Sequence, residues 1–196
     1  MKRIKDLFSK FSQLDYFLKI VKESIIIVVL SSILGMVSGT VLSFNEEILY
    51  SIPVILLLLP ALNSLIGDIS TVLVSRLTTQ LYIGIIPPNI EKSERLKEEF
   101  IGLLLTTILG LVALLLIGYS MAYFTGVDIV NPLIIILILL ITILLLFCMM
   151  FVFLFIAAIF IFKKGKDPNN FLIPAVTSLA DFLSPLFIII FITIFI

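Results

Sequence analysis

Three ionisable residues, Asp68, Arg76 and Asp181, stand inside long apolar stretches of this sequence. If those stretches cross a bilayer, each charge costs at least about 2.5 to 3.5 kcal/mol at the membrane centre, so such residues usually serve a function. Carboxylates are oxygen ligands for hard divalent cations, and Mg²⁺ in particular is held by one or two of them while it keeps several waters. Asp68 and Asp181 are therefore the first candidates for a cation site.

Each of the two acids closes a similar short motif, PALNSLIGD at 60–68 and PAVTSLAD at 174–181. The proline of each motif frees a backbone carbonyl four residues earlier, and small hydroxyl or amide side chains supply oxygens and allow helices to approach closely. We predict metal ligands from both motifs: Asp68, Asn63, Ser64, Asp181, Thr177 and Ser178. The alternative for the neutral residues is that they only join helices through hydrogen bonds.

Two further charged residues each have two interpretations. Arg76 follows Asp68 by eight residues, or about 12 Å along a helix, which is too far for a direct ion pair. It either extends its charge toward the membrane surface near the helix end or acts as a counter-ion or subunit contact. Asp167 precedes Pro168, a pattern typical of a helix N-cap. The alternative for Asp167 is a ligand at the cytoplasmic ion entrance.

The composition indicates what must position these side chains. Hydrophobic residues make up 61% of the 196 residues, which excludes an ordinary water-soluble globular protein. A membrane-spanning helix needs about 20 mostly apolar residues. Five stretches meet that requirement: 24–44, 50–84, 99–124, 132–162 and 171–195. Because lipid offers no partner for backbone polar groups outside helices and closed barrels, we predict an all-α integral membrane protein with five transmembrane helices.

Basic residues gather in the segments that would lie on one side of the membrane. All but one of the 13 Lys and Arg residues precede the first span, follow the second or follow the fourth. The loops on the opposite side contain only Glu46, Glu47 and Asp128 as charged residues. We therefore predict a multi-pass protein of the cell membrane with its N-terminus in the cytoplasm and its C-terminus outside. The formal net charge of zero gives no reason to expect nucleic-acid binding.

Residues 1–22 form a second predicted unit, next to a membrane domain at 23–196. Apolar residues recur there every three or four positions between charged and polar ones: Ile4, Leu7, Phe8, Phe11, Leu14, Phe17, Leu18 and Val21. This spacing predicts an amphipathic helix in the cytoplasmic headgroup layer, either as a basic anchor or as a plug that gates a pore. No signal-peptide cleavage site follows, so we expect the segment to be retained.

A pore would bring copies of these acids together. If two chains meet at a two-fold axis, paired Asp181 residues place a charge of about −2 at one level, and Asp68 can add as much. That charge suits a divalent cation and disfavours anions. The expected partners are a second copy of the chain, the lipid bilayer and divalent cations. The cation is the transported species, and no bound cofactor is expected.

The segments PALNSLIGDISTVLVSRLTTQLYIG and DPNNFLIPAVTSLAD extend the two motifs. They resemble the second-helix and final-helix signatures of the MgtE-type magnesium channels and transporters, a family that includes the eukaryotic solute carrier family 41. The resemblance implies a homodimer whose second and fifth spans line the ion path. It also implies that Asp181 of each subunit holds a hydrated cation, that Asp167 lies at the pore mouth, and that residues 1–22 take the place of the plug helix.

The sequence departs from that family at two points. It contains no counterpart of the family's cytosolic regulatory domain and paired CBS domains, so regulation through them is not expected. Asp68 stands where the family generally has a neutral Asn after a Gly. This charge leaves open an H⁺- or Na⁺-coupled transporter of another divalent metal, such as Mn²⁺, Co²⁺ or Ca²⁺.

Two intramembrane aspartates also raise the alternative of an intramembrane aspartyl protease, in which paired acids share a proton. The match is poor, because Leu65 stands where those enzymes carry the first Gly of Gly-x-Gly-Asp. The chain has no His and no P-loop, zinc or nucleophile–base signature. We therefore predict a transporter rather than an enzyme.

Overall fold

The computed structural model describes residues 2–89 and 93–196, and along the first helix it describes the side chains of residues 17, 18, 21 and 25 onward. Lys92 and the side chains of the six N-terminal Lys and Arg residues, which belong to the predicted cytoplasmic charge, lie outside the described residues.

The described chain is all-α. Its helices are α1 (Lys2–Phe44), α2 (Glu46–Tyr50), α3 (Pro53–Tyr82), α4 (Glu94–Thr125), α5 (Pro132–Lys163) and α6 (Pro168–Phe195). Five segments are long and apolar enough to cross a membrane: Ile25–Phe44, Pro53–Tyr82, Glu94–Thr125, Pro132–Lys163 and Pro168–Phe195. These segments confirm the all-α class and the five predicted apolar helices in their order.

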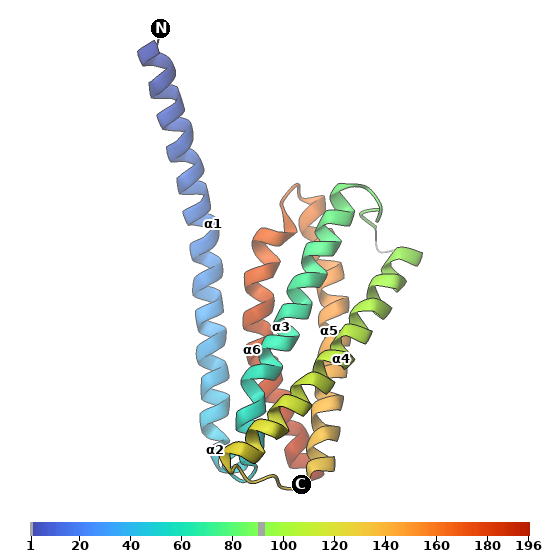
Figure 1. Cartoon of the computed structure of the whole chain (residues 1–196). Helices are drawn as coiled ribbons and strands as arrows, with labels where there is room; N and C mark the ends of the chain where they lie inside the picture. The colour runs from blue at the N-terminus through green and yellow to red at the C-terminus, as the bar shows by residue number, and fades with distance from the viewer. Residues whose placement is uncertain (1, 90–92) are drawn as a thin grey trace.

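The N-terminal segment differs from the prediction. α1 runs without interruption from Lys2 to Phe44, where the sequence predicts a separate helix over 1–22. No Pro or Gly occurs before Gly35, so this part of α1 lacks the two residues that most often kink a helix. Figure 1 shows the first part of α1 extending beyond the ends of the other helices. An interfacial position for residues 2–22 would require a bend in α1, and that position stays a prediction.

Prolines and capping residues set the helix boundaries. Three helices begin at a proline, whose fixed φ suits the first helical position: Pro53 of α3, Pro132 of α5 and Pro168 of α6. The second span starts later than predicted because Glu46–Tyr50 form the short helix α2. The Ser93 side chain caps α4 by accepting a hydrogen bond from the Leu96 N–H at 3.0 Å. Gly126 ends α4 with a φ of 71°, a left-handed conformation that glycine adopts easily.

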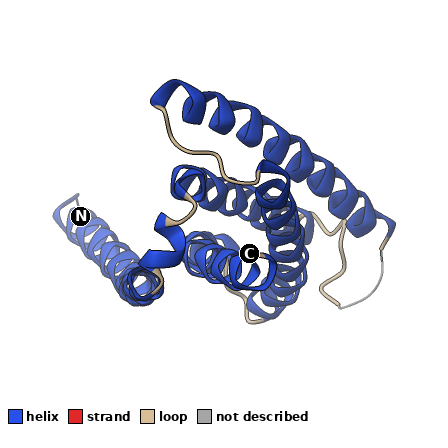
Figure 2. Cartoon of the chain, turned by 90° about the horizontal axis from the view of Figure 1, so that it is seen from below, coloured by secondary structure: helices blue, strands red, loops and turns tan. Residues whose placement is uncertain are grey.

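α6 is the central helix of the bundle. It contacts α1, α3 and α5, whereas α4 packs mainly on α3 and α1 contacts only α2 and α6 within the described residues. Figure 1 shows α1 at one outer side and α4 crossing diagonally at the other. Seen along the bundle in Figure 2, the C-terminal helix lies in the middle and the N-terminal helix lies at the outer edge. This arrangement leaves much of α1 and α4 exposed to lipid or to another subunit.

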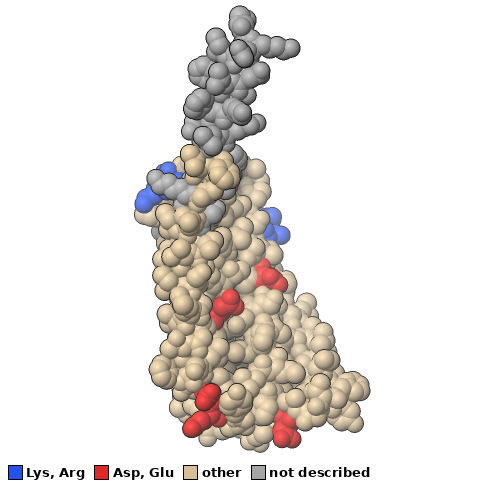
Figure 3. Space-filling model, turned by 90° about the vertical axis from the view of Figure 1, so that its left-hand side faces the viewer, with Lys and Arg blue, Asp and Glu red and all other residues tan. Residues whose placement is uncertain are grey.

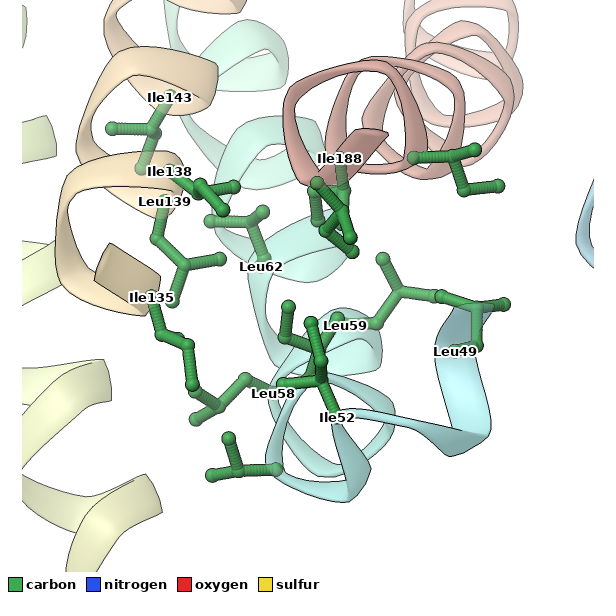
Figure 4. Close-up of a cluster of buried hydrophobic side chains, with 14 of the residues drawn as sticks. Leu49, Ile52, Leu58, Leu59, Leu62, Ile135, Ile138, Leu139, Ile143 and Ile188 are labelled. Atoms are coloured by element: carbon green, nitrogen blue, oxygen red, sulfur yellow. The ribbon is translucent and has the colours of Figure 1, made fainter. Parts of the chain in front are cut away.

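Buried apolar side chains fill the space between α3, α5 and α6. Figure 4 shows part of one such cluster: Leu49, Ile52, Leu58, Leu59, Leu62, Ile135, Ile138, Leu139, Ile143 and Ile188. Two glycines allow α4 to approach α3 closely. A Cβ atom at Gly118 would clash with Cδ2 of Leu58, and one at Gly110 would lie 2.6 Å from Cδ1 of Leu65. Small residues at such crossings are typical of membrane helices.

The two termini lie at opposite ends of the bundle, and the basic side chains on one face gather toward the end at which α1 begins. The N- and C-termini lie at opposite ends in Figure 1, as an odd number of crossings requires. In Figure 3, Lys and Arg lie toward the end at which α1 begins, whereas Asp and Glu lie at the other end and at mid-height. The charge asymmetry along the bundle therefore agrees with the positive-inside pattern, and the side that faces the cytoplasm stays a prediction.

Candidate functional site

The two intramembrane acids line the same cavity. It lies between α3 and α6, has a volume of about 470 Å³, and also includes Leu42 of α1 in its wall. Five of the predicted ligands line it: Asn63, Ser64, Asp68, Thr177 and Asp181. Leu59, Pro60 and Gly67 complete the wall. We call this space the acidic cavity.

α3 supplies Asn63, Ser64 and Asp68 to the acidic cavity. Ser64 and Asp68 are four residues apart and so lie on one face of the helix, and Asn63 is offset from Ser64 by about 100° around the helix axis. Pro60, one turn before Ser64, lacks an N–H and leaves the backbone carbonyl of Leu56 without its regular helical partner. The polar wall of α3 therefore begins at a locally weakened part of the helix.

The side-chain oxygen of Asn63 is buried and has no hydrogen-bond partner within the described residues. Buried amide oxygens normally accept a hydrogen bond from protein or from water. Because the oxygen itself is buried, Asn63 could offer it to a cation, or to one of the waters that a cation retains, only after its side chain turns toward the cavity.

α6 supplies Thr177 and Asp181, which are four residues apart and so lie on one face of the helix. The Thr177 hydroxyl donates to the carbonyl oxygen of Pro174 at 3.0 Å, which leaves its own oxygen able to accept or coordinate. Ser178 donates to the same carbonyl at 3.3 Å and does not line the acidic cavity. The structure therefore brings Thr177, and not Ser178, to the two acids.

Asp167 occupies the N-cap of α6. Its Oδ1 accepts a hydrogen bond from the Asn169 N–H at 3.0 Å, which confirms the capping interpretation. It precedes Asp181 by about 21 Å along the helix and does not line the acidic cavity. A role for Asp167 at the ion entrance stays a prediction.

Arg76 is bound to an acid that the sequence analysis missed. Its Nε and Nη2 donate to the two carboxylate oxygens of Glu99 at 2.6 and 2.8 Å. The Gln80 amide donates to the same carboxylate at 2.6 Å. Glu99 is 3% exposed and Arg76 is 50% exposed, so the pair joins α3 to α4 with the acid buried. The sequence feature that could have pointed to Glu99 is its position as the first residue of the predicted third span.

Asp68 also borders a second cavity, of about 540 Å³, between α3 and α4. Apart from Ser64 and Asp68, its wall is apolar: Leu57, Leu58, Ala61, Leu65, Gly110, Leu114, Ile117, Gly118 and Met121. Asp181 does not line this second space. The two acids therefore share one cavity but differ in their surroundings.

The acidic cavity offers few charged ligands. Within the described part of the chain, no group of three or more His, Cys, Asp and Glu side chains could hold a metal ion. Two carboxylates, an amide oxygen and two hydroxyls are too sparse a set to replace the whole hydration shell of a divalent cation. They suit a hard cation that keeps several of its waters.

A protein-family model described as MgtE, divalent cation transporter, matches residues 59–192. The matched range contains all residues of the acidic cavity except Leu42. Comparisons with curated proteins and with solved structures found no match.

Proposed function

The chain belongs to the MgtE family of divalent cation transporters, and on that premise we propose that it moves Mg²⁺ across the cell membrane through the acidic cavity. The observation that carries this proposal is the meeting of Asp68 and Asp181, from helices far apart in sequence, in one cavity. Asn63, which lines the same cavity, would add a neutral ligand beside them once its buried side-chain oxygen turns toward the ion.

The size and chemistry of the acidic cavity suit a hydrated ion. Mg²⁺ is six-coordinate and gives up its waters reluctantly. Six waters at about 30 Å³ each occupy roughly 180 Å³, which is less than the cavity volume of about 470 Å³. Carboxylates can then hold the ion through direct or water-mediated contacts without stripping it, which permits both entry and release.

We propose further that the transporter is a homodimer whose α3 and α6 helices line the conduit. In the single chain, Asp68 and Asp181 are both exposed, although they lie within helices that are long and apolar enough to span a membrane. Facing hydrocarbon would cost at least about 2.5 kcal/mol per charge. A second copy related by a two-fold axis covers this face and joins the two acidic cavities into one water-filled path.

The second acid also supports a related alternative. Asp68 adds a charge beside Asp181, and a site with this charge can take H⁺ or Na⁺ as well as a divalent ion. Coupled transport of Mn²⁺, Co²⁺ or Ca²⁺ is therefore the second candidate function. Uptake measurements with competing divalent cations and an imposed proton or sodium gradient distinguish it from uncoupled Mg²⁺ transport.

The shared cavity also has two aspartates that an intramembrane aspartyl protease would require. Membership of a transporter family favours transport over proteolysis. A peptide product that disappears when either Asp68 or Asp181 is changed would instead support the protease.

The central test is Asp181→Ala in protein reconstituted into liposomes that contain a Mg²⁺-sensitive dye. We expect uptake to fall below one-tenth of the parent rate, because the cavity loses the carboxylate that faces the conduit from α6. The oligomeric state measured in detergent should stay unchanged, since two like-charged carboxylates that face a water-filled path repel each other and do not hold the subunits together.

Asp128→Ala is the matched control, because Asp128 lies in an exposed loop between α4 and α5 and outside the acidic cavity. It should transport as the parent does. Parent-like uptake by a correctly assembled Asp181→Ala protein would remove the acidic cavity from the proposed function.

A further inference from the structure

Asp181 has an unusual backbone as well as an exposed carboxylate. In a regular α-helix, the carbonyl of residue 181 accepts a hydrogen bond from the N–H of residue 185. Position 185 in α6 is a buried proline, which has no N–H to donate. The peptide oxygen of Asp181 is therefore left without its regular partner, at the residue proposed to hold the ion.

That oxygen accepts a hydrogen bond from a residue of α1 instead. The Ser38 hydroxyl donates to the Asp181 carbonyl at 2.6 Å. Of the α1 side chains that the structure describes, Ser38 alone is buried, with 6% of its surface exposed. Because lipid gives apolar helices little reason to associate, close contacts and interhelical hydrogen bonds hold such pairs together. The Ser38 bond is thus a principal point at which α1 is fixed to α6.

A second serine provides a comparison within the same pair of helices. Ser31 precedes Ser38 by seven residues, and its hydroxyl lies 3.4 Å from the carbonyl oxygen of Pro174, seven residues before Asp181. That oxygen also accepts hydrogen bonds from Thr177 and Ser178. Loss of the Ser31 hydroxyl therefore leaves the carbonyl satisfied, whereas loss of the Ser38 hydroxyl does not.

We propose that Ser38 is a positioning residue for Asp181, so that α1 controls the orientation of the ion-binding carboxylate. This proposal rests on the proposed function of Asp181. The hydrogen bond fixes the Asp181 peptide plane, and with it the direction in which its side chain leaves α6. Leu42, one turn after Ser38 on α1, lines the acidic cavity, so a displacement of α1 at Ser38 also moves part of the cavity wall.

The test is a double-mutant cycle with Ser38→Ala and Pro185→Ala, read out as the Mg²⁺ concentration dependence of uptake in liposomes. Ser38→Ala should raise the half-saturating Mg²⁺ concentration about three- to tenfold, the range expected from one interhelical hydrogen bond. Pro185→Ala restores an N–H at position 185. In that background, Ser38→Ala should change the half-saturating concentration less than twofold.

Two further variants keep the test decisive if Pro185→Ala does not fold. Ser38→Thr retains a hydroxyl and should transport as the parent does. Ser38→Val has nearly the same shape as Ser38→Thr but no hydroxyl, and it should behave as Ser38→Ala. Ser31→Ala is the control on the same helix and should have less than a twofold effect.

Two results would overturn the role of Ser38. One is an equal effect of Ser38→Ala in the two backgrounds, and the other is a lower yield or maximal rate with an unchanged half-saturating concentration, which indicates a purely structural contact. If Asp181→Ala abolishes uptake while Ser38→Ala and Ser38→Val do not affect it, only the Ser38 proposal fails. If Asp181→Ala has no effect, the proposed function fails as well.

Discussion

Asp68 is the residue that distinguishes this cavity chemically, because it adds a second carboxylate from α3 to the one that α6 supplies. It is exposed in the single chain and borders both the acidic cavity and the second cavity, between α3 and α4. In the proposed homodimer, a cation in the acidic cavity would therefore experience two negative charges from each subunit. The strength of that attraction depends on how much water the cavity retains.

Asp68→Asn keeps the shape of the side chain and removes this charge. A unit charge about 5 Å from a divalent ion contributes roughly 1 to 2 kcal/mol in a water-filled space, so the half-saturating Mg²⁺ concentration should rise about tenfold. Transport by the variant should persist, and its preference for divalent over monovalent cations should weaken. Concentration-dependent uptake of Mg²⁺ and competition by Na⁺ in liposomes measure both effects.

Asp128→Asn makes the same chemical change in an exposed loop and should leave both quantities at the parent values. An Asp68→Asn protein with the parent's affinity and selectivity would show that Asp68 does not act on the ion.

At the residue scale, the paired motifs predicted most of the cavity. Proline, small polar residues and an acid recur in the same order, and five of the six ligands predicted from these motifs line the acidic cavity. The motifs did not separate Thr177 from Ser178, because adjacent residues with hydroxyls differ only in their direction around the helix, by about 100°. Ser38 was not predicted either, since its partner is a backbone oxygen that no side-chain pattern reveals.

At the scale of elements, the main polar link between α3 and α4 is the cluster of Arg76, Gln80 and Glu99. The Glu99 carboxylate is nearly fully buried and accepts from both partners. Removing it leaves Gln80 without an acceptor and leaves Arg76 with an unpaired charge. Because Arg76 is half exposed, water compensates part of the loss, and we place the cost of removal at about 2 kcal/mol.

Glu99→Ala should therefore lower the melting temperature of the purified protein by roughly 4 to 8 °C, from the usual relation between stability and melting temperature for chains of this size. Thermal unfolding in detergent measures the shift. Glu98→Ala is the matched control, because the neighbouring Glu98 is 67% exposed and pairs with Arg95 at the surface. It should change the melting temperature by less than about 2 °C, as exposed ion pairs contribute little. Equal shifts for the two variants would contradict a special role for the buried carboxylate.

The helices themselves were largely predictable, and their ends were less so. Long apolar runs in lipid have essentially one regular backbone conformation open to them, so five spans followed from hydrophobicity alone. The start of α3 was predicted too early, because Glu46–Tyr50 form a helical turn of their own before Pro53. The sequence did not predict the ion-pair partner of Arg76. That partner lies on another helix, and the spacing of residues along one helix cannot identify it.

At the scale of the whole molecule, α1 connects the N-terminal segment to the proposed ion path. It is one helix from Lys2 to Phe44, and Ser38 of the same helix contacts the backbone of Asp181. The sequence predicted two units there because its polarity changes near residue 22, but a change in polarity does not break a helix that contains neither Pro nor Gly at that point. A movement of the N-terminal segment that tilts α1 would therefore reach the Ser38 contact directly.

The proposed homodimer makes a geometric prediction that the single native cysteine helps to test. Cys148 is exposed on α5, and α5 contributes no residue to the acidic cavity. Thr177 is exposed and lines that cavity. If the two acidic cavities face each other across a two-fold axis, copies of residue 177 approach one another and copies of residue 148 remain apart.

We expect Thr177→Cys in a Cys148→Ser background to form covalent dimers in native membranes on mild oxidation or with a short thiol crosslinker. A disulfide requires Cα atoms about 4.4 to 6.8 Å apart, so the crosslinker covers a somewhat wider separation. The parent, which carries only Cys148, is the control and should remain monomeric on denaturing gels. Crosslinking through Cys148 with none through residue 177 would place the subunit contact on α5. The proposal that α3 and α6 of two subunits line the conduit would then be wrong.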